Sequence, residues 1–231
     1  MIRKKGQRIR AISFDASDTL FHLRRRVGEV YAEVAREQGS VLDPDALEAA
    51  FRAVWKERPQ REDGVRQEDD RGFWEELVRE VLRRCGQGQE LSGRLFLAAY
   101  ERYCGAAEWK LFPETRAVLA DLAETWPLYV TSNYDGRLHG TLQALGVDGF
   151  FQKVIVSSEV GSDKPAPGIF AATQRAAGVA AGEILHVGDQ READWLGARR
   201  AGMAAWLVVR PMHSLSELRG RIESGDIDLP E

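Results

Sequence analysis

Short, largely apolar runs bounded by Gly, Pro, Asn or Asp limit the folds open to this chain more than any other feature. They cover residues 11–14, 128–131, 154–157, 184–187 and 204–209. Runs this short are typical of strands that are buried on both faces of a sheet. Helical patterns separate the later runs, at residues 114–124, 137–145 and 167–177. Because strands and helices alternate, the sequence predicts an α/β fold with a parallel, doubly wound sheet.

The stretch from residue 24 to residue 107 follows a different pattern. Apolar residues recur there at helical spacing in four places, around Val30, Phe51, Val78 and Tyr100. Amphipathic helices of this kind bury their apolar stripes against one another. We therefore expect a helical cap domain at residues 24–107, inserted into a core domain formed by residues 1–23 and 108–231. The insert would cover the site like a lid, and the charged segment 57–72 is expected to be a loop between helix pairs.

Composition and charge exclude several classes of function. The 231 residues carry a net charge of −4, and 44% of them are hydrophobic. No basic surface dominates, which argues against nucleic-acid and acidic-membrane partners. No apolar run is long enough for a transmembrane helix, and the two cysteines, Cys85 and Cys104, form no C-x-x-C motif. We expect a soluble, unprocessed cytoplasmic protein with reduced thiols that binds a small anionic substrate through local cations.

Chemically active side chains follow the predicted strands. Asp15 comes directly after the first strand, Ser132 and Asn133 end the second, and Asp189 follows the fourth. Since the carboxyl ends of parallel strands share one edge of a sheet, these residues are expected to lie close together. Asp15 is the candidate nucleophile, because a carboxylate can attack phosphorus or carbon and form an ester that water then cleaves. A strand-end Asp is also a common turn or cap residue.

Carboxylates that converge need a cation between them. Asp189 and Asp194 would repel Asp15 unless a hard cation such as Mg²⁺ neutralised them, although Asp194 can also act through a water or cap a helix. Lys164, in a loop, can stabilise developing negative charge, whereas most lysines are solvated. Ser132, Asn133 and Thr19 can hydrogen-bond to a phosphoryl or carboxylate oxygen of a substrate.

The order of these residues resembles the haloacid dehalogenase (HAD) superfamily of hydrolases. The matching positions are Asp15 to Thr19, Ser132, Lys164-Pro165 and Gly188-Asp189 with Asp194. The resemblance spans nearly the whole chain and implies a Rossmann-like core with a helical cap. It also implies that Asp15 is the nucleophile, that Ser132 and Lys164 bind the phosphate, and that Asp15 and Asp189 bind Mg²⁺.

One position departs from the pattern of the superfamily's phosphatases. Those enzymes carry a second Asp two residues after the nucleophile, which serves as acid and base, and this chain has Ser17 there. Asp18 is one residue further on, where its side chain would face the opposite way. A missing acid and base costs about 10²- to 10⁴-fold in rate, although the carbonyl of Ser17 can still bind Mg²⁺.

We therefore predict a magnesium-dependent phosphatase-like hydrolase, weak in activity, that acts on a small phosphorylated metabolite. The predicted catalytic residues are Asp15, Ser17, Thr19 and Lys164. The predicted substrate-binding residues are Ser132, Asn133 and Lys164. The predicted metal ligands are Asp15, Ser17, Asp189 and Asp194. The sequence indicates no oligomeric state.

Two other functions stay open at this stage. Ser17 favours a non-catalytic relative that binds a phospholigand or a protein. A 2-haloacid dehalogenase also lacks the second Asp. Such enzymes, however, dispense with Mg²⁺ and have a less acidic fourth motif than this chain. They also need an arginine that binds the substrate carboxylate, and Arg24, Arg25 or Arg26 would have to supply it. His186, inside an apolar run, is either an ordinary core histidine or a residue that orients a loop.

Overall fold

The computed structural model describes residues 8–58 and 70–228. Within these ranges the chain forms two compact units, one of residues 8–22 and 110–228 and the other of residues 23–58 and 70–109. The chain leaves the first unit in strand β2 (Phe21–Leu23) and returns to it in β3 (Trp109–Leu111), and these two strands pair in a small sheet.

The first unit is built on a five-stranded parallel sheet. Its order is β5-β4-β1-β6-β7, so β1 is central. The strands are β1 (Ala11–Phe14), β4 (Leu128–Ser132), β5 (Phe151–Val156), β6 (Ile184–Gly188) and β7 (Ala204–Leu207). Every residue of β1, β4 and β6 is buried, as expected for central strands of a parallel sheet. The prediction of a parallel α/β sheet is confirmed, although β5 begins three residues earlier than its apolar run indicated.

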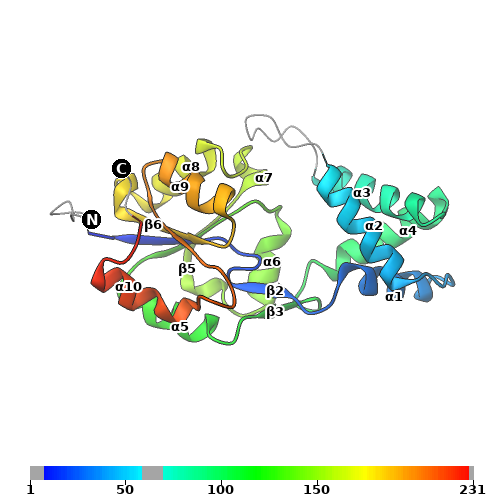
Figure 1. Cartoon of the computed structure of the whole chain (residues 1–231), viewed down its shortest axis with the longest axis horizontal. Coiled ribbons are helices and arrows are strands. Elements are labelled where there is room, and N and C mark those ends of the chain that lie inside the picture. Colours follow the sequence, from blue (N-terminus) through cyan, green and yellow to red (C-terminus); the bar gives the residue numbers. More distant parts are fainter. Residues whose placement is uncertain (1–7, 59–69, 229–231) are drawn as a thin grey trace. The chain divides into compact units, whose positions relative to one another are not determined.

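Helices cover both faces of this sheet, as Figure 1 shows. On one face lie α7 (Ser157–Val160), α8 (Pro167–Ala177) and α9 (Gly197–Arg200). On the other face lie α5 (Thr115–Ala123) and α10 (Leu218–Ser224), and α6 (Arg137–Ala144) connects β4 with β5. Phe170 of α8 and Ala198 of α9 are fully buried against sheet residues such as Tyr129. Burial of these apolar surfaces stabilises the unit and fixes the strand ends that carry the site.

The second unit consists of four helices around one apolar core. They are α1 (Val27–Glu37), α2 (Pro44–Glu57), α3 (Asp70–Arg84) and α4 (Gln89–Arg102). Leu47, Leu82 and Leu95 are fully buried in this core. Most of the predicted loop 57–72 lies outside the described residues, but its two ends belong to α2 and α3. Among residues 8–58 and 70–228, no helix is long and apolar enough to span a membrane.

Strand register brings the predicted site residues to one edge of the sheet. Phe14 of β1 pairs with Val130 of β4 and with Val187 of β6. Asp15 follows Phe14 directly, and Ser132 and Asp189 come two residues after the paired valines. These residues therefore lie together at the carboxyl ends of adjacent strands. This edge carries Asp15, Ser132 and Asp189.

Candidate active site

The loop after β1 is held against β6 by its backbone. The N–H of Asp15 donates to Val187 O at 2.8 Å, and the Asp15 side chain is only 7% exposed. Thr19 is buried, Ser17 is half-buried and Asp18 is exposed. Asp18 has φ +60°, a left-handed conformation that Asp tolerates better than most residues other than Gly. The tight turn thus places Asp15 and Thr19 inside the site and directs Asp18 to the surface.

Lys164 lies in the centre of the site. Its ammonium is 2.6 Å from Asp15 Oδ1, 2.6 Å from Asp194 Oδ1 and 2.8 Å from Thr131 O. An ammonium has three donors, and each has an acceptor here. The Lys164 side chain is only 2% exposed. Lys164 is therefore a buried cation shared by two carboxylates, and its role in binding substrate and stabilising developing charge stays a prediction.

Ser132 and Asn133, at the end of β4, make different contacts. The hydroxyl of Ser132 donates to Asp15 Oδ1 at 2.9 Å. The amide of Asn133 donates to Lys164 O at 2.8 Å and accepts from Lys164 N at 2.6 Å. Asn133 thus holds the backbone of the lysine loop, a task that sequence reasoning missed. Its contact with a substrate stays a prediction.

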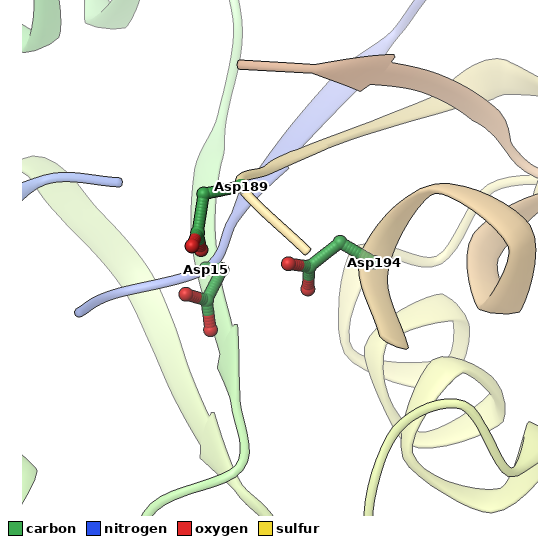
Figure 2. A group of neighbouring side chains, drawn as sticks. All are labelled: Asp15, Asp189 and Asp194. Carbon is green, nitrogen blue, oxygen red and sulfur yellow. The ribbon is translucent and has the colours of Figure 1, made fainter. Parts of the chain in front are cut away.

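Three carboxylates approach one another at this edge, as Figure 2 shows. Asp15, Asp189 and Asp194 each offer an oxygen within 4.8 Å of the others. Thr19 Oγ1 donates to Asp189 Oδ1 at 3.3 Å. Asp194 makes the most hydrogen bonds of the three. Its Oδ1 is bound by Lys164 Nζ and His186 Nε2, and its Oδ2 accepts from Gln190 N at 2.9 Å. Asp15 and Asp189 therefore have more freely available oxygens than Asp194.

The pKa shifts follow from burial and from the excess of negative charge. Burial raises the pKa of Asp189 to about 7, and the neighbouring Asp15, Asp194 and Asp18 add to the shift. Burial also raises the pKa of Asp15, although Lys164 opposes it. Burial would raise the pKa of Asp194 as well, but Lys164 and His186 together hold it well below its usual range. For Lys164, the two carboxylates outweigh burial and raise the pKa.

This donor set fits a hard divalent cation. Carboxylate oxygens are the ligands that Mg²⁺ prefers, and a raised pKa marks a carboxylate that lacks a neutralising charge. Asp15 and Asp189 would hold the ion, and its positive charge would favour the ionised form of both carboxyl groups. The predicted ligand roles of Ser17 and Asp194 stay predictions.

Two further residues support the site: Arg210, which had no local signal in the sequence, and His186, which the sequence indicates to be either a core histidine or a residue that orients a loop. Arg210 donates to Thr19 O at 3.1 Å and pairs with Glu114 at 2.8 Å, so that it holds the loop after β1. His186 is 1% exposed and contacts Asp194 through Nε2 and Ser13 through Nδ1, each at 3.1 Å. Burial lowers the pKa of His186, so that its ring is neutral near pH 7.

The fold, the site and the comparisons with known proteins all indicate the same protein family. A model of the haloacid dehalogenase-like hydrolase family matches residues 9–202, and the chain belongs to this family. Haloacid dehalogenase-like hydrolase domain-containing protein 3 from Danio rerio is 32% identical over 237 residues, which cover 93% of this chain and 97% of the relative.

Two further proteins add detail to the comparison. Glyceraldehyde 3-phosphate phosphatase from Methanopyrus kandleri is 30% identical over 238 residues, which cover 96% of this chain and 91% of the relative. The crystal structure of the putative HAD-hydrolase YfnB from Bacillus subtilis bound to magnesium matches with a TM-score of 0.73. The match has 20% sequence identity and covers 94% of this chain and 99% of that chain. The predicted membership in the superfamily is confirmed, and the chain is a hydrolase of this family.

Proposed function

We propose that this hydrolase is a magnesium-dependent phosphatase that works through an aspartyl-phosphate on Asp15. The observation that carries the proposal is the bridge formed by Lys164, which binds Asp15 and Asp194 at 2.6 Å each, beside Asp189. A buried cation next to a strand-end carboxylate provides both a nucleophile and a charge to receive an anionic group. The phosphatase from M. kandleri and the magnesium-bound YfnB support this choice.

The chain's own residues account for the transfer step. One oxygen of Asp15 attacks phosphorus, the bond from phosphorus to the leaving oxygen breaks, and the leaving oxygen takes a proton from solvent. The hydroxyl of Ser132 and the ammonium of Lys164 bind the oxygens of the transferred group, where negative charge accumulates. Water then cleaves the aspartyl-phosphate and regenerates Asp15. Bound Mg²⁺ supplies further charge stabilisation.

Ser17 sets the level of activity in this proposal. A serine hydroxyl is a poor acid near pH 7, and Asp18 is exposed in a left-handed conformation instead of taking its place. Proton transfer by a positioned group contributes about 10²- to 10⁴-fold. The enzyme is therefore slow with alkoxide leaving groups, and faster with leaving groups that need no proton. We propose a small phosphorylated metabolite as the substrate.

Dehalogenation is a weaker proposal, because its candidate arginines have other partners. Arg25 donates to both oxygens of Glu108, at 3.1 and 2.7 Å. Arg24 donates to Trp109 O at 2.7 Å, and Arg26 pairs with Asp45 at 2.7 Å. Each of the three arginines thus binds a partner in the second unit. A non-catalytic phospholigand-binding role keeps Ser17 as its supporting observation.

An assay with several substrates tests the proposal. 4-Nitrophenyl phosphate and acetyl phosphate would be supplied with Mg²⁺ and with a chelator, and 2-chloropropionate with a chelator. We expect phosphate release that needs Mg²⁺ and vanishes in Asp15→Asn. Magnesium binding without any turnover would instead support the non-catalytic role, and chloride release in the presence of a chelator would support dehalogenation.

A further inference from the structure

A closed ring of hydrogen bonds runs behind the site through three adjacent strands. His186 of β6 contacts Ser13 of β1, with 3.1 Å from Nδ1 to Oγ, and Ser13 lies 2.7 Å from Thr131 Oγ1 of β4. Thr131 O accepts from Lys164 Nζ, which also binds Asp194, and Asp194 contacts His186 Nε2. The ring therefore returns to His186. All five residues are buried.

The positions of Ser13 and His186 follow from the strand register. Ser13 pairs with His186 across β1 and β6, so their side chains leave the same face of the sheet side by side. Thr131 Oγ1 is in turn 2.7 Å from Thr173 Oγ1 of α8. The hydroxyl groups thus connect the imidazole to a helix on that face, which restricts its rotation.

The contact with Asp194 determines which ring nitrogen of His186 is protonated. A carboxylate oxygen only accepts, so Nε2 carries the hydrogen and donates to Asp194 Oδ1. The same oxygen accepts from Lys164, and the Gln190 N–H binds the other one. Asp194 is therefore fixed from three sides, and its orientation sets where the Lys164 ammonium lies relative to Asp15.

We propose that His186 is a positioning residue that, through Asp194, holds the Lys164 ammonium on the Asp15 carboxylate. The inference rests on the proposed function, and it extends that function to a residue that touches neither substrate nor metal. Buried partners that orient site residues typically change activity by about 10- to 100-fold when they are removed. An ordinary core histidine would affect stability alone.

Three variants separate positioning from packing. His186→Leu removes both hydrogen bonds, whereas His186→Gln keeps an N–H donor that can reach Asp194. His213→Leu is the matched control, because His213 contacts Leu207 O at 3.1 Å and takes no part in the ring. With 4-nitrophenyl phosphate and Mg²⁺, we expect His186→Leu to lose about 10- to 100-fold in kcat with KM within about twofold. His186→Gln should recover most of this loss, and His213→Leu should match the wild type.

Crystal structures of the same proteins provide a readout that does not depend on activity. We expect the distance from Lys164 Nζ to Asp15 Oδ1, 2.6 Å here, to exceed about 3.5 Å in His186→Leu and to return in His186→Gln. If His186→Leu does not fold, Ser13→Ala replaces it and should lower kcat at constant KM by releasing the imidazole.

The two proposals fail in different ways. Unchanged kcat with Lys164 in place in His186→Leu, or a His186→Gln variant no better than His186→Leu, would overturn the positioning role. A wild-type protein that hydrolyses no phosphate ester would overturn the proposed function, and the Lys164 position in the crystal structures would then decide the role of His186.

Discussion

Gly188 and Asp194 pack so closely that a Cβ atom on residue 188 would lie 2.3 Å from Asp194 Cγ. Gly188 ends β6 directly before Asp189, and Asp194 lies in the helical turn Arg191–Leu196. The φ angle of Gly188 is not in the left-handed region that favours glycine. A glycine is needed there because a side chain would clash with Asp194. The absence of a side chain lets the Asp194 carboxylate reach Lys164.

Replacing Gly188 with alanine tests this packing. Gly188→Ala should displace Asp194, release Lys164 and lower kcat by about 10-fold or more, as loss of a buried orienting partner does. Gly220→Ala is the control, because nothing lies within 4 Å of a Cβ built there. Steady-state kinetics with 4-nitrophenyl phosphate provide the measurement. Equal kcat values for both variants would show that the Asp194 position does not matter for turnover.

Removing the buried cation should affect both activity and stability. Lys164→Met leaves Asp15 and Asp194 without their shared partner, and breaking a buried ion pair costs about 3–5 kcal/mol in the free energy of unfolding. Turnover should fall by about 10²-fold or more, because charge on the transferred group loses its stabilisation. Lys153→Met, at an exposed position of β5, should change neither quantity. Urea unfolding that gives equal stabilities for the two variants would contradict this expectation.

Restoring a carboxyl group two residues after Asp15 should widen the range of leaving groups. Ser17→Asp can protonate an alkoxide, so hydrolysis of alkyl phosphates should rise by up to about 10²- to 10⁴-fold. Release of 4-nitrophenolate needs no proton and should change little. Ser17→Asn, of the same size but without an acidic proton, is the control. A gain in Ser17→Asn equal to that in Ser17→Asp would show that proton transfer is not what the wild type lacks.

The metal-free protein should lose stability as pH rises from about 4 to about 7. The pKa of Asp189 is raised to about 7 from 3.8, so over this interval the folded state binds more protons than the unfolded state does. Stability decreases with pH wherever the folded state holds the extra protons. Asp194, with its lowered pKa, acts in the opposite sense, and its contribution is lost only as pH falls below about 4.

Thermal unfolding in a chelator measures the contribution of Asp189. We expect Asp189→Asn to flatten the pH dependence between pH 5 and pH 7, and added Mg²⁺ to raise the wild-type midpoint most at the upper end. For a chain of this length each kcal/mol corresponds to about 2–4 °C. A wild-type profile identical to that of Asp189→Asn would show that Asp189 does not titrate in this range.

Much of this site was predictable because the signal is local in the sequence. Asp15, Ser132 and Asp189 each follow a short apolar run, and in a parallel sheet such positions meet at one edge. The hydroxyl of Ser132 and the ammonium of Lys164 both reach Asp15 Oδ1. Residue type and strand position therefore predicted which side chains come together.

The supporting contacts could not be predicted, because they depend on register between distant strands. Ser13 and His186 lie 173 residues apart in the sequence, and their hydrogen bond exists only because β1 and β6 pair in one register. A polar residue inside an apolar run does not reveal its partner. Likewise, nothing local indicated that Asn133 binds the backbone of Lys164 or that Arg25 binds Glu108.

Detection of a phosphoryl group on Asp15 tests the central claim most directly. The protein would be incubated with acetyl phosphate and Mg²⁺, quenched in acid and mapped by peptide mass spectrometry. Because Ser17 is a poor base for the second step, we expect the aspartyl-phosphate to accumulate on the peptide that contains Asp15, and to be absent from Asp15→Asn and from samples with a chelator. Turnover of acetyl phosphate without any phosphoryl group on Asp15 would contradict the account.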